Sequence, residues 1–431
     1  MLKAGFARVD VTPPLGTYVA GYFQDRYAKG VLDPIYLNAV AVSDENETVV
    51  IITADFLNMS ATFADELRAH IAKRTGIPAN HLMISCLHQH TSAVLREGGI
   101  SSALADEGYR SVLVRKFGDA AEMALADCSE ATLSRAEGET AEPLSFIRRH
   151  VLKDGTYQTN TPKNCWDEIV RPCDDADNTV RLLRFSRKEG NDIAFVNFST
   201  HPDVIGGELL SADWPGFVRR FVENDLEGVS CLLINGAQGD SNHINAIGQV
   251  YNKGYAYSRH MGRVIADVVL QKWDQTIPCE DVVIHADVTN VYNRTRTDGE
   301  ERYDECVKLI EEYNRLGKDF PHPFNKVLEA RRILGIRNAM IYRRLPITVV
   351  SLGQVALVGF GGEAFTHYAT AVREACPDRY IIAACCTNGG EGYLPTEAAF
   401  SEGGYESVVS QFTPTLEREC VAAAAELLGK M

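Results

Sequence analysis

The sequence predicts an α/β fold in which mixed β-sheets are flanked by helices within one large domain. Short apolar runs rich in β-branched residues alternate with segments of helical periodicity along the chain. The 431 residues are 45% hydrophobic and 23% charged, a composition typical of globular proteins. No shift in composition marks a linker, so we expect residues 1–431 to form a single domain.

The apolar runs predict buried strands, because a strand that is covered on both faces is apolar along its length. They span residues 48–53, 82–86, 194–198, 231–234, 347–351, 355–360 and 380–384. The helical segments span residues 61–74, 103–126, 214–223, 255–273, 300–315, 325–338, 364–375 and 415–428. The predicted helices 300–315 and 325–338 follow each other without a strand between them, which interrupts the strand-rich pattern. This indicates an insertion or lid at 295–340. The polar, aperiodic stretch 154–178 is typical of a long functional loop.

Charge and targeting patterns restrict the classes of partner. The chain carries 43 basic and 58 acidic residues, which gives a net charge of −15. Nucleic-acid binding and stable association with an anionic membrane both need a basic face, so we expect neither. No apolar stretch approaches the ~20 residues of a membrane helix, no secretory signal is visible, and the cysteines are scattered. We expect a cytoplasmic protein that acts on a small molecule, with its oligomeric state left open.

Histidines follow two of the predicted strands at the point where each strand ends. His88 and His90 come directly after residues 82–86, and His201 comes after residues 194–198. Ligands of α/β proteins bind at the carboxyl ends of strands. A His-x-His pair in an extended segment places both rings on one side, which suits a metal ligand and a neighbouring proton carrier. Hydrogen-bonded histidines in a capped loop are the alternative.

Four further loops carry polar groups, three of them after predicted strands. The glycine-containing turn after residues 231–234 presents Asp240, Ser241, Asn242 and His243, which an ordinary Asx-type turn would also explain. Glu363 follows two glycines and either favours a helix start or binds a cation. Tyr393 and Tyr405 stand in glycine-rich loops, where their hydroxyls can donate to an oxyanion. Two histidines and one glutamate form the ligand set of a catalytic zinc site with an open position.

The order of these motifs resembles the neutral/alkaline (non-lysosomal) ceramidases over their N-terminal catalytic domain, and more closely the shorter bacterial proteins that share only this domain. The resemblance runs in order from residue 5 to about residue 410. It rests on the segments 5–14 (Gly-Phe-Ala-Arg-Val-Asp-Val-Thr-Pro-Pro), 87–92 (Leu-His-Gln-His-Thr-Ser), 197–202 (Asn-Phe-Ser-Thr-His-Pro), 236–242 (Gly-Ala-Gln-Gly-Asp-Ser-Asn), 361–363 (Gly-Gly-Glu) and 392–396 (Gly-Tyr-Leu-Pro-Thr).

The resemblance implies a Zn²⁺ ion and assigns a role to each matched residue. The zinc ligands that it implies are His88, His201, Glu363 and Tyr393. The implied proton carrier is His90, beside the metal-bound water.

The resemblance also implies groups that bind the substrate carbonyl or the product carboxylate. These groups are Tyr405 and Arg148, with Arg149 as the alternative to Arg148. The family's turn serine aligns with Asn242, and Ser241 stands one residue earlier, beside Asp240. We keep Ser241 and Asp240 as candidate catalytic residues, although this offset points to metal-activated water as the nucleophile.

The sequence therefore predicts a zinc-dependent amidohydrolase that cleaves an amide bond with metal-activated water. The segment that could cover the site, residues 300–315, is heavily charged, so we expect a soluble N-acyl compound or another small polar substrate rather than a long-chain lipid. Two alternatives stay open. One is a zinc hydrolase of an ester or a sugar-linked substrate, and the other is a non-catalytic binding protein with a ceramidase-like pocket.

Overall fold

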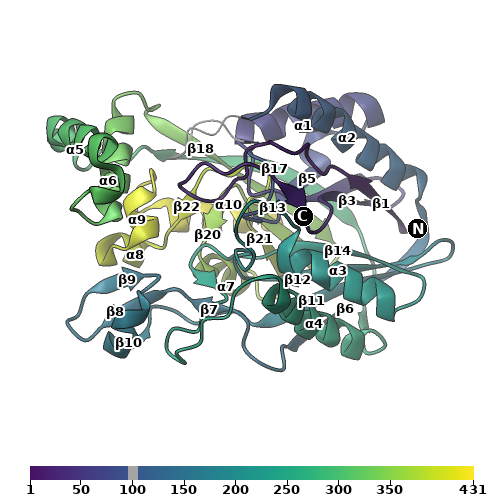
Figure 1. Ribbon diagram of the computed structural model, residues 1–431. Coiled ribbons are helices and arrows are strands. Elements are labelled where there is room, and N and C mark those ends of the chain that lie inside the picture. Colours follow the sequence, from purple (N-terminus) through teal and green to yellow (C-terminus); the bar gives the residue numbers. More distant parts are fainter. Residues whose placement is uncertain (96–104) are drawn as a thin grey trace.

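The computed structural model describes residues 1–95 and 105–431 (Figure 1), so the first residues of the predicted helix 103–126 lie outside it. Among the described residues, the main feature is a nine-stranded mixed sheet in the order β14-β12-β11-β6-β1-β3-β4-β5, with β16 paired to β6. Its strands are β1 (Lys3–Asp10), β3 (Tyr36–Ser43), β4 (Thr48–Ala54), β5 (Leu82–Cys86), β6 (Ser129–Glu139), β11 (Thr179–Arg187), β12 (Asp192–Phe198), β14 (Val229–Asn235) and β16 (Ile277–Pro278).

A four-stranded sheet in the order β17-β18-β19-β21 faces this large sheet. Its strands are β17 (Ile284–Arg294), β18 (Tyr342–Leu352), β19 (Val355–Phe360) and β21 (Tyr380–Ala384). Parallel pairs join β4 to β5, β12 to β14 and β19 to β21, whereas the neighbouring pairs are antiparallel. The prediction of mixed sheets is confirmed.

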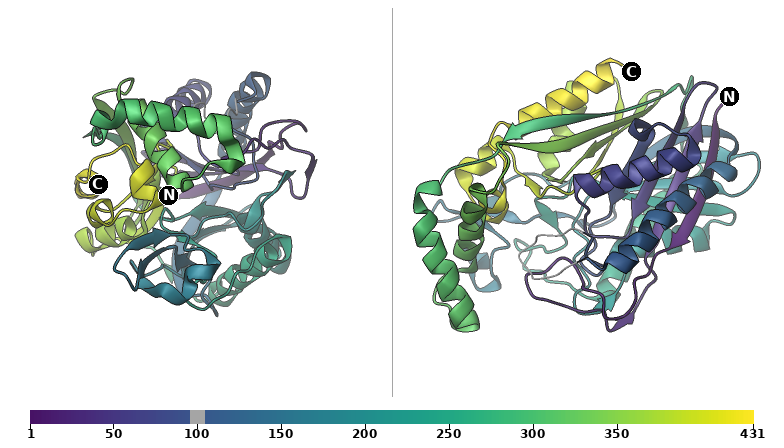
Figure 2. Two further views of the ribbon diagram at one scale, coloured as in Figure 1. Left: turned by 60° about the vertical axis from the view of Figure 1, so that its left-hand side comes forward. Right: turned by 90° about the horizontal axis from the view of Figure 1, so that it is seen from above.

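The core lies between the two sheets, because alternate residues of each strand point to opposite faces. Val40 and Val42 of β3 pack with Leu357 and Ile382 of the smaller sheet. Ala39 and Ala41, which alternate with these valines, belong to a cluster that contains helical residues. The molecule is therefore layered, with helices outside each sheet (Figure 2). Apolar side chains of both sheets form a seam between them.

Helices cover the outer faces of both sheets, as the sequence predicts. The helices α1 and α2 lie over the β1–β3–β4 part of the large sheet, and α3 and α4 lie over its other half. The helices α7 and α10 lie over the smaller sheet. Their bounds are α1 (Ala61–Thr75), α2 (Glu107–Ala126), α3 (Asp213–Asp225), α4 (Tyr255–Lys272), α7 (Thr366–Ala375) and α10 (Leu416–Gly429). Within the described ranges, no helix is long and apolar enough to cross a membrane.

A helical hairpin projects from one end of the molecule, next to α8 (Glu397–Glu402) and α9 (Tyr405–Val409) (Figures 1 and 2). It consists of α5 (Tyr303–Leu316) and α6 (Phe324–Ile336) and falls within the segment 295–340. The two helices share a small apolar cluster of Cys306, Ala330 and Ile333, and α6 also contacts α9.

The stretch 154–178 is not the long loop that its polarity suggests. It contains β9 (Tyr157–Thr159), the short 3-10 helix η2 (Lys163–Glu168) and β10 (Ile169–Pro172), and both strands pair with β8 (Arg149–Leu152). These strands are only partly buried and a bulge interrupts the β10–β8 register, so no apolar alternation marks them in the sequence.

A buried ion pair ties the large sheet to helix α3. The Arg219 guanidinium donates to both carboxylate oxygens of Asp55, over 2.8 and 2.7 Å, and neither side chain is more than 3% exposed. Asp55 also accepts from the Gln89 side chain at 3.2 Å and from the Tyr36 backbone at 3.0 Å. Gln89 stands between His88 and His90, so this pair holds the loop that carries both histidines.

Replacing Arg219 with Met leaves the Asp55 carboxylate buried without its cation. We expect Arg219→Met to lower the free energy of unfolding by about 3–5 kcal/mol, measured by urea denaturation. The double variant Asp55→Asn/Arg219→Met removes both charges and should recover part of this loss. A single variant that is as stable as the unmodified protein would show that the pair does not support the sheet–helix junction.

Candidate active site

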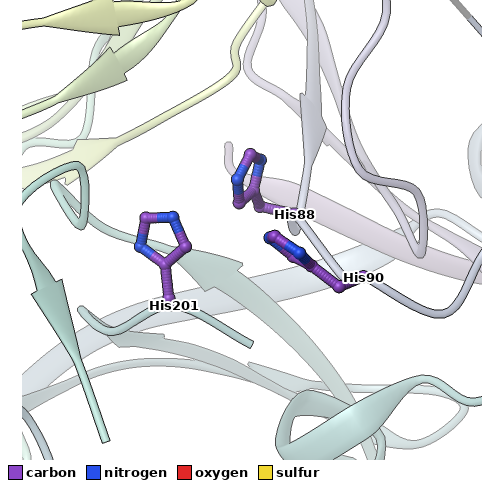
Figure 3. Close-up of side chains that lie close together, drawn as sticks. All are labelled: His88, His90 and His201. Carbon is purple, nitrogen blue, oxygen red and sulfur yellow. The ribbon is translucent and has the colours of Figure 1, made fainter. Parts of the chain in front are cut away.

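The residues selected from the sequence meet where strands of both sheets end. His88 and His90 follow β5, and His201 follows β12 in the large sheet. Glu363 lies in β20 (Glu363–Ala364), just after β19, and Tyr393 lies in β22 (Tyr393–Leu394), beyond β21. Figure 3 shows the imidazole rings of the three histidines gathered around one common space. The strand-end rule therefore brings together groups from two layers of the fold.

His88 adopts a backbone conformation that the extended His-x-His interpretation did not predict. Its φ of 76° lies in the left-handed region, so the segment is not a regular strand. The ring Nδ1 lies 3.0 Å from the Leu57 carbonyl, which makes Nδ1 the protonated nitrogen and leaves Nε2 to face the site. The His88 and His90 rings still lie on one side, with centroids 5.2 Å apart.

His201 is fixed in the same way. Its Nδ1 lies 2.8 Å from the Gln238 carbonyl and 3.0 Å from the Ser241 carbonyl, and the ring is 1% exposed. Backbone carbonyls that accept from Nδ1 orient an imidazole so that Nε2 can act as a ligand. The ring centroid of His201 lies 4.9 Å from that of His88.

Glu363 places a buried carboxylate between these two rings. Its Oε2 lies 3.2 Å from His88 Nε2 and 3.4 Å from His201 Nε2. Burial alone would raise the pKa of the carboxyl, but His88 and His201 hold that pKa well below its usual value. The structure does not place Glu363 at a helix start, one of the two roles considered for it. The residue pairs with Tyr393 in a parallel β20–β22 bridge, and α7 begins at Thr366.

The donor set fits a divalent transition metal. Ligand nitrogens of His88, His90 and His201 lie within 4.8 Å of one another. Neither ring nitrogen of His90 has a hydrogen-bond partner, and no well-aligned hydrogen bond satisfies the buried Glu363 Oε2. Burial lowers the pKa of His90 to about 4 and that of His201 to about 3, so both rings are neutral and free to bind a cation. Buried polar atoms without partners are rare in folded proteins, and here they converge on one point.

Two phenols stand beside the carboxylate. The rings of Tyr393 and Tyr405 contact each other with centroids 5.4 Å apart. Burial, reinforced by the charge of Glu363, raises the pKa of both hydroxyls, so both phenols are protonated at neutral pH. Tyr405 opens the short helix α9 rather than lying in an irregular loop.

The structure distinguishes between the two candidate arginines. The Arg148 guanidinium lies 3.3 Å from His201 Nε2, and its other nitrogens donate to Glu406 at 2.7 Å and to the Gly239 carbonyl at 2.8 Å. Arg149 is directed elsewhere, toward the Glu402 side chain and the Gly403 carbonyl. Arg148 is therefore the arginine beside the histidines.

The turn at Asp240 and Ser241 supports the site from behind. The Asp240 carboxylate accepts from the backbone nitrogen and the hydroxyl of Thr366, each at 2.8 Å, and burial raises its pKa to about 6. This carboxylate fixes the start of α7 and has no hydrogen bond to the histidines. Ser241 has a buried hydroxyl without a hydrogen-bond partner. Asn242 accepts from the Ile244 backbone at 2.9 Å, which is the Asx turn considered above.

Other residues of the site were not singled out from the sequence. Asp203 lies 3.9 Å from His90 Nδ1 and accepts a hydrogen bond from the Tyr22 hydroxyl. Glu406 is fully buried and is the carboxylate partner of Arg148. Their positions offer a signal, since Asp203 follows His201 by two residues and Glu406 follows Tyr405 directly. Tyr22, in an irregular N-terminal segment, offers none.

A cavity of about 310 Å³ opens beside the histidine cluster. His201, Arg148 and Asp203 form the wall on the side of the cluster, and Asn242 and His243 line another part. The cavity also receives Asn160, Lys163 and Trp166 from the segment that was predicted to be a loop. A space of this size next to polar groups that converge on one point has the form of a small-molecule site.

The buried ring of His243 should make the folded protein less stable as the pH falls. Burial lowers the pKa of its ring to about 4, with Lys253 lowering it and Asp203 raising it. The unfolded chain binds this proton near pH 6.5, so between pH ~6.5 and ~4 the ring costs about 1.4 kcal/mol of stability per pH unit. We expect His243→Gln to lose less stability on acidification than the unmodified chain, as measured by urea denaturation at several pH values. His322→Gln, at an exposed histidine, is the control, and equal slopes in all three proteins would contradict the assignment.

Solved structures, unlike sequences, provide matches to this chain. No protein-family model and no curated protein matches the sequence. A neutral ceramidase from Pseudomonas aeruginosa superposes with a TM-score of 0.73 and 15% identity, covering 100% of this chain and 75% of that chain. A ceramidase complexed with C2 gives a TM-score of 0.73 and 15% identity, with coverage of 100% and 76%. The chain therefore has a ceramidase-like fold along its whole length.

Proposed function

We propose that this protein is a zinc-dependent hydrolase that cleaves an amide bond in a small polar substrate. The observation that carries the proposal is the buried Glu363 carboxylate, which meets His88 Nε2 and His201 Nε2 beside the unpaired ring of His90. The ceramidase-like fold supports the same reaction class by analogy.

The residues proposed to hold zinc are His88, His201, Glu363 and Tyr393. The Nδ1 atoms of both histidines are engaged by backbone carbonyls, so their Nε2 atoms face the site. A cation on His201 Nε2 would replace the contact of this nitrogen with Arg148. Zinc, when bound, supplies a Lewis acid and a water whose pKa is lowered to ~7. Tyr393 faces Glu363 across the β20–β22 bridge, which places the fourth donor beside the carboxylate.

His90 is the proposed proton carrier. Its ring is neutral and both nitrogens lack hydrogen-bond partners, so the nitrogen that carries no proton can accept one during attack and return it to the leaving amine. Asp203 lies 3.9 Å from His90 Nδ1 and stabilises the ring once it is charged. The Arg26 guanidinium donates to the His90 carbonyl at 2.8 Å and fixes its backbone.

Arg148 and Tyr405 are proposed to bind the substrate carbonyl oxygen or the product carboxylate. The Arg148 side chain is almost fully buried and its charge is held by Glu406, so it is oriented before substrate binds. Tyr405 keeps its proton because burial raises its pKa, which preserves its hydroxyl as a hydrogen-bond donor. Asp240 has a positioning role at the start of α7.

The helical hairpin α5–α6 is proposed to act as a lid at 295–340. Phe324 of α6 contacts Phe23 with ring centroids 4.9 Å apart, and Phe23 contacts Tyr405 at 6.2 Å. This aromatic series connects the hairpin to the site. The outer helix α5 buries only Cys306 and carries many charges, which favours a water-soluble substrate over a lipid held in a bilayer.

A substrate assay with metal analysis tests this function. We expect the purified chain to contain close to one zinc, and to cleave soluble N-acyl compounds with a higher kcat/KM than long-chain ceramide in mixed micelles. His88→Ala and His201→Ala should each lose most of the zinc, because each variant removes one of the few proposed protein ligands. His322→Ala, at an exposed histidine, is the matched control and should keep it.

The outcomes of this assay separate the alternatives. Ceramide cleaved in preference to all soluble amides would overturn the proposed substrate class. Esters or sugar-linked compounds cleaved while amides are not would favour a different zinc hydrolase. A chain that binds small polar ligands without turnover would be a binding protein, and a chain that binds no transition metal would exclude the proposed mechanism.

A second experiment separates Ser241 from the metal set as the source of the nucleophile. We expect Ser241→Ala to retain measurable turnover, because its hydroxyl has no base within hydrogen-bond distance. Glu363→Gln should lower kcat by at least about 100-fold, since it neutralises a proposed ligand. Trapping of a covalent acyl group on Ser241, detected by mass spectrometry, would contradict this assignment.

A further inference from the structure

The cavity beside the histidines has a cationic character that is unusual for this acidic chain. Lys163 and Lys253 line it together with the buried Arg148, whereas Asp203 is its one carboxylate among the described lining residues. The chain as a whole carries a net charge of −15. Two lysines on one small cavity therefore stand out from their surroundings and predict a ligand of opposite charge.

Across the described chain, no carboxylate forms an ion pair with Lys163 or Lys253. The charge of Lys253 acts on the Asp203 carboxylate and helps to lower its pKa, but at a longer distance than a direct ion pair. The Lys163 ammonium lies 3.9 Å from the centre of the Tyr251 ring, and the Lys253 ammonium lies 5.8 Å from the centre of the Tyr22 ring. Both ammonium groups are thus held near aromatic faces at the rim, with their hydrogen-bonding capacity unspent.

A buried polar side chain in the same cavity also lacks a partner. His243 is 3% exposed, and neither of its ring nitrogens has a well-aligned hydrogen bond, although the Asn252 backbone is close enough to favour the protonated ring. An unsatisfied buried imidazole costs stability unless a ligand or ordered water completes it. His243 lines the cavity that also holds Lys253, so one ligand group can reach both.

We propose that this cavity binds an anionic group of the substrate, either a carboxylate or a phosphate. The inference rests on the proposed hydrolase function and specifies its substrate class. Arg148 and His201 border both the cavity and the histidine cluster. A substrate whose scissile carbonyl lies at the histidines can therefore place a charged group in the cavity that Lys163, Lys253 and His243 line.

A neutral polyol is the strongest competing ligand, because Trp166 and Tyr251 also line the cavity. A polyol site needs acceptors as well as donors. The Asp203 carboxylate already accepts from the Tyr22 hydroxyl and faces His90, while Lys163 already covers the Tyr251 ring. The free groups are mainly donors and cations, which favours an anion.

Binding measurements on the full chain, as purified, test the proposal without relying on turnover. Two pairs of probes match an anion to a neutral analogue, namely glutarate with glutaramide and glycerol phosphate with glycerol. We expect at least one anion to bind about five- to tenfold more tightly than its neutral analogue, as measured by isothermal titration calorimetry. This preference should shrink when the salt concentration is raised.

The variant Lys163→Met/Lys253→Met should abolish the preference, while Lys188→Met should retain it. Lys188 is an exposed lysine that pairs with Glu130 at the opposite end of the large sheet, so it controls for the loss of surface charge. Comparison of the carboxylate pair of probes with the phosphate pair identifies which anion the cavity binds. Equal affinity for anion and neutral analogue in both pairs, or a preference that survives in the double variant, would overturn the proposal.

Hydrolysis is then measured separately on N-acyl compounds that carry a carboxylate, a phosphate or a neutral amide. A lysine-dependent anion preference without hydrolysis of any amide would disprove the hydrolase function while leaving the anion site in place. Hydrolysis that is equally fast for charged and neutral compounds would disprove the anion site and leave the hydrolase function in place.

Discussion

The ionised carboxylate of Glu363, buried where the two sheets meet, is the constraint on which the rest of this molecule depends. Burying a carboxylate costs several kcal/mol unless partners compensate, and here the partners are the imidazoles of His88 and His201. Each imidazole must in turn be held by a backbone carbonyl. The loops after β5, β12 and β19 therefore have little freedom to move. A Cβ on Gly239 would lie 2.3 Å from the Glu363 carbonyl, which shows how closely these loops pack.

Polar contacts deep in the protein provide the rigidity that the site requires. The Asp55–Arg219 pair fixes Gln89 within the histidine loop, and Asp240 fixes the start of α7 next to Glu363. The carboxylates of Asp55 and Asp240 have hydrogen-bond partners, although the Gln89 Oε1 is buried without one. The site itself is different, because His90 and the Glu363 Oε2 are buried without satisfied hydrogen bonds. Buried polar atoms without partners also occur elsewhere in the described chain, but at the site several of them lie together where a ligand would bind.

Continuous apolar runs identify several buried strands without help from distant residues, although the buried strand β3 was not among those predicted. The strands 82–86, 355–360 and 380–384 match the structure to the residue. The long strands β6 and β17 were not predicted, since each is only partly buried and mixes polar with apolar side chains. The strands β9 and β10 were also not predicted, because their sequences are polar. Both pair with β8.

The chemistry-bearing residues could be selected from strand ends, but their geometry could not. The left-handed backbone of His88 and the parallel pairing of Glu363 with Tyr393 both arise from contacts between segments far apart in the chain. The choice between Arg148 and Arg149 depends on contacts with distant residues, because Arg148 meets His201 whereas Arg149 donates to Glu402 and Gly403. Local sequence reports the presence of a reactive group, whereas long-range packing decides which way it points.

The division of the site between two layers has a mechanical consequence. His88 and His201 belong to loops of the large sheet, while Glu363 and Tyr393 belong to loops of the smaller one. Any slide of one layer past the other must change the distances between the imidazole nitrogens and the carboxylate. A cation bound by ligands from both layers would link the two sheets across the apolar seam. It would slow the separation of the layers, so occupancy of the site would set the lifetime of the folded state as well as its activity.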